Sequence, residues 1–79
     1  MNTWKIEYTD TFGGEANYCW VKRDEITLPD GLTNSQIKRA AKKQLDLSGV
    51  PGRWNDFGDF FEFRPYNSAT VLFITYDYS

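Results

Sequence analysis

One segment in the middle of this chain carries signals for both ends of a helix. Thr33 and Gln36 have the spacing of a capping box, in which each side chain bonds the backbone N–H of the other residue. Gly49 can supply the left-handed residue that follows a helix, and Pro51 prevents the helix from continuing. We therefore predict a single helix over residues 34–47. The segments on both sides have a different pattern, which restricts the chain to a mixed fold.

The residues before the helix have the pattern of a β-hairpin. Residues 4–8 alternate between aromatic or apolar and charged side chains, which is the period of a half-buried strand. Residues 17–28 are rich in β-branched and aromatic side chains. The pair Gly13 and Gly14 stands between these segments, and such a pair favours a tight turn.

Side-chain alternation predicts the two faces of the second strand. Lys22 can avoid the core only on the side of the sheet away from the helix. Tyr18 and Trp20 share that side with Lys22, so the Trp20 ring is expected to be exposed there. Cys19 and Val21 are then expected to face the helix, with Cys19 as a small core residue.

Two more strands are predicted after the helix. Residues 60–64 alternate, residues 70–78 are almost continuously apolar or aromatic, and residues 66–69 separate them as a turn. Residues 51–59 contain two glycines and are expected to form a loop. The order ββαββ predicts one α+β domain over residues 1–79, with one helix packed on one face of a four-stranded antiparallel sheet. We expect the function to lie on the other face of the sheet, which such a fold can leave open to solvent.

Composition argues against an enzyme. The chain has no His, which removes the commonest general base and metal ligand. Cys19 is its only cysteine, so neither an intrachain disulfide nor a cysteine-based zinc site can form. A small chain without disulfides suits a reducing cytosol, and no apolar run approaches the ~20 residues of a membrane span. We therefore expect a non-enzymatic binding domain with no cofactor, no metal and no membrane partner.

Aromatic and acidic residues are mixed in the predicted loop and at the start of the strand after it. Trp and Arg are enriched among the residues that dominate protein interfaces, so this loop can present anchors to a protein partner. Its aromatic side chains can instead tuck under the loop as a small hydrophobic cluster. The first interpretation gives a candidate partner-binding set, to which the exposed Trp20 is added: Trp54, Asp56, Phe57, Asp59, Glu62 and Trp20.

The predicted helix carries an alternative site. Four of its residues are basic and one is acidic, which gives the helix a charge of +3 and leaves -5 for the rest of the chain. These side chains can form the solvated face of an amphipathic helix, or a basic patch for nucleic acid or an acidic protein surface. The net charge of -2 makes nucleic acid the less favoured partner. The residues of this patch are Lys38, Arg39, Lys42 and Lys43.

Two segments resemble those of short phage and mobile-element proteins. One reads Tyr-Thr-Asp-Thr-Phe-Gly-Gly-Glu-Ala-Asn-Tyr-Cys-Trp-Val over residues 8–21, and the other lies around residues 58–66. Proteins of this kind are often inhibitors of host defence, including anti-CRISPR proteins. The resemblance implies a phage-type inhibitor that acts in the host cytoplasm by occluding the surface of a bacterial protein or ribonucleoprotein defence complex. It transfers no site residue, and a small nucleic-acid-associated accessory protein that uses the basic helix stays open as the alternative.

Overall fold

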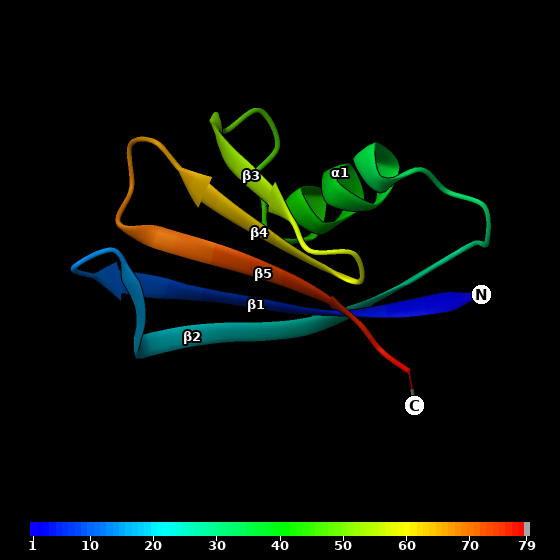
Figure 1. Ribbon diagram of the computed structural model, residues 1–79, viewed down its shortest axis with the longest axis horizontal. Coiled ribbons are helices and arrows are strands. Elements are labelled where there is room, and N and C mark those ends of the chain that lie inside the picture. Colours follow the sequence, from blue (N-terminus) through cyan, green and yellow to red (C-terminus); the bar gives the residue numbers. More distant parts are fainter. Residues whose placement is uncertain (79) are drawn as a thin grey trace.

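Five antiparallel strands form one sheet with a single helix on one of its faces in the computed structural model, which describes residues 1–78 (Figure 1). The sheet order is β2-β1-β5-β4-β3. The α+β class and the antiparallel sheet are confirmed, but the predicted four strands in the order ββαββ are wrong, because the order is ββαβββ. The elements are β1 (Asn2–Phe12), β2 (Glu15–Leu28), α1 (Asn34–Gln44), β3 (Gly52–Asp56), β4 (Phe60–Pro65) and β5 (Thr70–Tyr76).

Strand β3 is the element that the sequence analysis assigned to a loop. It pairs with β4 from Gly52 opposite Pro65 to Asp56 opposite Phe61. Glycine is required at its first position, since a Cβ on Gly52 would come within 2.5 Å of the Phe63 ring. Five residues that start with glycine give a weak periodic signal, so pairing with β4 rather than local pattern defines this strand.

The helix begins as predicted and ends earlier. Thr33 and Gln36 form both hydrogen bonds of the capping box. The helix stops at Gln44, and Asp46, with φ at +59°, takes the left-handed position that the prediction gave to Gly49. The N–H of Leu47 donates to the carbonyl of Lys42 (2.7 Å), which completes a Schellman motif around Asp46. Gly49 is also left-handed, with φ at +80°, but in the turn beyond the helix end.

We call the side of the sheet that carries α1 the covered face and the opposite side the open face. The hydrophobic core lies between the covered face and α1, which contributes Ile37 and Ala41. Its strand residues are Trp4, Ile6, Ile26, Phe61, Phe63, Leu72 and Ile74. Within residues 1–78, no helix has the length and apolar character needed to cross a membrane.

The face assignment within β2 needs correction. Tyr18 does lie on the open face, but Lys22 and Trp20 lie on the covered face, since Lys22 pairs with Tyr8 and the Trp20 ring packs edge-on against Tyr8. Val21 pairs with Thr9 on the open face, and Cys19 is exposed rather than part of the core. The prediction failed because α1 is short and leaves this end of the covered face open, so a lysine can stay there in solvent.

Candidate functional site

The open face carries a broad groove of about 920 Å³, which we call the aromatic groove. Its lining comes from strands β1, β2, β4 and β5, so it crosses most of the sheet. Phe60 and Phe73 form one part of it, and Tyr18 forms another. Its charged lining residues are Lys5, Glu7, Arg23, Asp24 and Glu25.

Three phenylalanines make a continuous apolar strip: Phe60 and Phe73 line the groove, and Phe57 continues the strip beyond it. The rings of Phe60 and Phe73 stack with centroids 5.6 Å apart. Phe57, in the turn between β3 and β4, packs against Phe60 at 5.3 Å and is 60% exposed. Large rings that stay in contact with solvent are a common mark of an interaction surface, because burying them on binding removes much apolar area from water.

A hydrogen-bonded acid lies beside this strip. Glu7 accepts hydrogen bonds from the Tyr18 hydroxyl (2.7 Å) and from Arg23 Nε (3.0 Å). The Tyr18 hydrogen bond and, to a smaller extent, the Arg23 guanidinium hold the pKa of Glu7 below its usual value. The same contact raises the pKa of the Tyr18 hydroxyl. Lys5 and Glu25 stand opposite each other on neighbouring strands and are both exposed, so the groove offers polar groups of both signs to a ligand.

An irregularity of the β1–β2 hairpin brings Tyr18 to the groove. Between the pairs Thr9–Val21 and Thr11–Ala16, the single residue Asp10 stands opposite the four residues 17–20. We call these four residues the β2 bulge. Strand β2 therefore has three more residues than β1 between these two pairs, so its backbone must bend there.

Asp10 holds the β2 bulge in place. Its carboxylate accepts hydrogen bonds from the backbone N–H of Cys19 (2.9 Å) and from the Asn17 side chain (3.0 Å). The Asn17 contact and the backbone donors lower the pKa of Asp10. Tyr18 adopts a φ of +55°, which is uncommon for a bulky residue, and its ring reaches Glu7 from this conformation.

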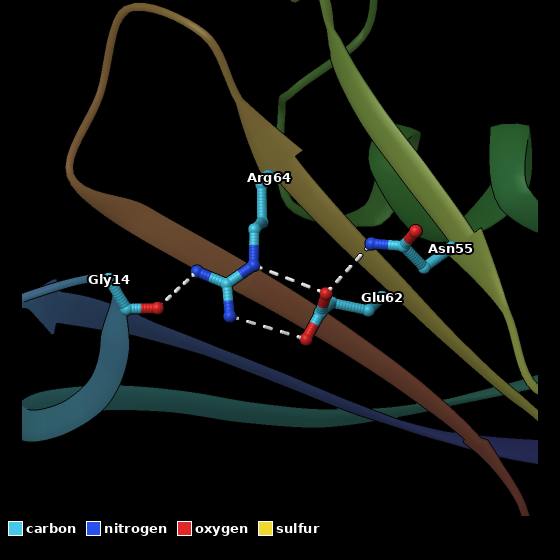
Figure 2. A network of polar contacts seen from close by, with 4 residues as sticks. All are labelled: Gly14, Asn55, Glu62 and Arg64. Atoms are coloured by element: carbon cyan, nitrogen blue, oxygen red, sulfur yellow. Dashed lines mark hydrogen bonds and ion pairs between the residues drawn. The ribbon is translucent and has the colours of Figure 1, made fainter.

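The other end of the open face is closed by a polar network (Figure 2). Arg64 donates to Glu62 through Nε (3.1 Å) and to the Gly14 carbonyl through a terminal nitrogen (2.6 Å), while Asn55 donates to Glu62 (3.0 Å). Burial opposes ionisation of Glu62, but the donors Arg64 and Asn55 outweigh it and keep the pKa of Glu62 below its usual value. Figure 2 shows the Arg64 side chain crossing β5 toward the β1–β2 turn. The network therefore limits the groove to one end of the face.

The predicted partner-binding residues lie on several surfaces. Trp54 and Asp56 belong to the covered face, where the Trp54 ring lies 4.7 Å from that of Phe63. Trp20 is 42% exposed and lies on the same face beyond the helix, at the far edge of the sheet. These three residues therefore do not form one site with the open face.

The other predicted residues lie nearer to the groove. Phe57 and Asp59 occupy the turn between β3 and β4, where the Asp59 carboxylate accepts a hydrogen bond from the Tyr78 hydroxyl. Glu62 lies on the open face but is held by Arg64. Of the six predicted residues, only Phe57 extends the aromatic strip.

The structure divides the four basic residues of the helix into two pairs. Lys38 Nζ lies 5.0 Å from the centre of the Trp54 ring, and Lys42 Nζ lies 4.5 Å from that of Phe63. Both stems therefore pack toward the sheet, as long basic side chains can do over apolar surface. Arg39 and Lys43 remain exposed, so the four do not make one solvent-facing patch.

The sequence analysis did not identify the groove residues Glu7, Tyr18, Arg23 and Phe73 as a site. One signal was available, since Lys5 and Glu7 alternate with Trp4 and Ile6 and so fall on the face away from the core. The pairing of β1 with β5, which brings Phe73 opposite Glu7, depends on the fold as a whole.

Within residues 1–78, no group of three or more acidic or cysteine side chains is arranged to hold a metal ion. Comparison of the chain with protein-family models, with curated proteins and with solved structures gives no match.

Proposed function

We propose that this chain is a non-enzymatic inhibitor that binds a protein surface through the aromatic groove. The observation that supports this proposal is the strip formed by Phe57, Phe60 and Phe73 on a sheet face without a covering helix. Aromatic anchors surrounded by polar groups are the usual composition of a binding hot spot. Lys5 and Glu25, which line the groove, supply charges that can select the orientation of the partner.

The proposed target is a bacterial defence complex, either protein or ribonucleoprotein, in the host cytoplasm. The resemblance of residues 8–21 to short phage proteins supports this class of target. The resembling segment includes the β2 bulge and Tyr18, which lines the groove. Inhibition would follow from occlusion, because a protein seated on a working surface excludes its substrate without any chemistry.

The alternative, a nucleic-acid accessory protein that uses the helix, has less support. Lys38 is paired with Asp56, and Lys42 donates to the carbonyl of Val50. Only Arg39 and Lys43 on the helix would be free to contact phosphate. Two phosphate contacts give weak nucleic-acid binding, whose affinity falls only slightly as the salt concentration rises.

The proposal is tested in bacteria that carry one defined defence complex at a time. Cells expressing the chain are challenged with a phage that the complex restricts, and the tagged chain is purified to see whether the same complex copurifies. Phe57→Ser removes an exposed ring of the strip and is expected to weaken binding by about tenfold or more, with loss of protection of the phage. Phe12→Ser is the matched control, since Phe12 is 79% exposed but, unlike Phe57, does not pack on a ring that lines the groove.

The results separate the two surfaces. If both variants bind and protect like the wild type, the strip of Phe57, Phe60 and Phe73 is not the binding surface, and the proposal loses the observation that supports it. If Arg39→Glu with Lys43→Glu abolishes binding and Phe57→Ser does not, the helix is the binding surface. Circular dichroism of each variant shows whether the fold is intact.

A further inference from the structure

Strand β2 forms one edge of the sheet along its whole length of 14 residues, and Figure 1 shows no element beyond it. An edge strand presents unpaired backbone N–H and C=O groups that can pair with another strand. The β2 bulge restricts regular pairing to the part of β2 that follows it. Two features of this part point to one particular partner.

The first feature is an exposed ring just before this part of β2 and a hollow at its far end. Trp20 is the last residue of the β2 bulge, lies on the covered face and is 42% exposed. At the other end, β2 and α1 line an open hollow of about 480 Å³, whose lining includes Ile26, Leu28, Ala40 and Lys43. Trp20 and Ile26 lie three residues before and after Arg23, so a two-fold axis at Arg23 brings the ring of one copy to the hollow of the other.

The second feature is the charge order along the edge. Lys22 and Arg23 are followed by Asp24 and Glu25. An antiparallel pair of identical strands joins residues of the same face, and the axis at Arg23 sets Lys22 opposite the partner's Asp24 at two symmetric positions. An axis at Asp24 would instead oppose two aspartates and place Lys22 against Ile26. The two Arg23 side chains meet at the axis, but each is already bound to Glu7 (3.0 Å).

We propose that two copies of the chain pair through β2, with Arg23 at the two-fold axis and Trp20 of each copy seated in the hollow beside Ile26 of the other. Charged side chains on an edge strand usually prevent it from pairing with another strand. Here the positive Lys22 and the negative Asp24 instead favour the one register that places them opposite each other. This dimer is independent of the proposed inhibitor function. The axis runs perpendicular to the sheet, so both aromatic grooves would face the same side.

The test is sedimentation equilibrium of the untagged chain and of two charge variants. Wild type is expected to be dimeric. Lys22→Asp and Asp24→Lys each place like charges opposite one another, and each alone is expected to raise the dimer dissociation constant about tenfold or more. An equimolar mixture of the two variants restores opposite charges at both positions and is expected to form a heterodimer.

The proposal is overturned if wild type stays monomeric up to roughly 1 mM. It is also overturned if either variant dimerises like wild type, or if the two folded variants fail to associate when mixed. If a charge variant does not fold, Trp20→Ser tests the interface instead. The proposed dimer needs the exposed Trp20 ring, whereas within one chain this ring packs on Tyr8. Phe12→Ser is its control: equal dimerisation of the two variants would exclude the proposed interface.

Discussion

Lys38 on α1 and Asp56 on the edge strand β3 form an ion pair with 2.7 Å between Nζ and Oδ1. The lysine side chain is only 17% exposed, and its ammonium lies over the rings of Trp54 and Phe61. The pair therefore connects the helix to the last strand of the sheet. Asp56, which was predicted to bind a partner, therefore pairs with a helix residue within the fold.

Asp56→Asn is expected to lower the free energy of unfolding by about 1 kcal/mol, because Lys38 would keep its half-buried position without a carboxylate. Urea unfolding followed by circular dichroism measures this change. Asp30→Asn is the control, since the pair between Asp30 and the N-terminal amine is exposed on both sides; its effect should stay within ~0.5 kcal/mol. Equal losses in the two variants would contradict a special role of the Lys38 pair.

Asp46→Gly is expected to stabilise the protein by about 1 kcal/mol. Asp46 has a φ of +59° at the end of α1, where glycine avoids the strain of a Cβ. The substitution also removes a negative charge from the negative end of the helix dipole. A thermal melt that shows an unchanged or lower midpoint would contradict this assignment of the helix end.

Gly49→Ala is expected to have the opposite sign. Gly49 has a φ of +80°, and a Cβ there meets no neighbouring atom, so the cost is backbone strain alone, about 1 kcal/mol. The same melts measure it. A stabilised Gly49→Ala would show that this turn does not need the left-handed conformation.

Asp10 is expected to contribute to the acid sensitivity of the fold. Its pKa in the folded state is below the ordinary value of 3.8, so its carboxylate stabilises the fold above about that pH, and this contribution is lost as the pH falls toward the folded pKa. The stability difference between wild type and Asp10→Asn should therefore be largest near pH 5 and should shrink toward about pH 2. Denaturant titrations at several pH values measure it, and a difference that grows on acidification would have the wrong sign.

Arg64→Ala is expected to loosen the β1–β2 turn. The variant leaves the Gly14 carbonyl and the Glu62 carboxylate without their charged donor, at a cost of about 1–2 kcal/mol. Hydrogen exchange of the backbone amides in residues 11–16 should become faster than in wild type. Arg39→Ala, on the exposed side of α1, is the control and should leave these amides unchanged.

Local signals in the sequence predicted the features that depend on a few neighbouring residues. The start of α1 followed from the capping box of Thr33 and Gln36, and the β1–β2 turn followed from the glycine pair, both of whose residues have positive φ. The helix end was missed because an aspartate, Asp46, adopts the conformation that glycine favours.

Features that depend on distant contacts were not predicted. Strand β3 exists through its pairing with β4, and the β2 bulge exists because Asp10 collects donors from the opposite strand. The aromatic groove was missed for the same reason, since Phe73 and Tyr18 come from strands at opposite ends of the chain. The expectation that the open face carries the function is kept in the proposal.

The pairing of β1 with β5 in the middle of the sheet has a consequence for how fast the chain folds. Their partner residues are 60 to 72 positions apart, from Asp10 with Thr70 to Trp4 with Tyr76. The hairpin β1–β2 and the unit of β3, β4 and β5 can each form early from nearby residues, but the core closes only when these two units meet. Loop closure over such a distance costs entropy before any contact compensates for it, so we expect slow folding for a protein of this size, with a rate limited by this docking step.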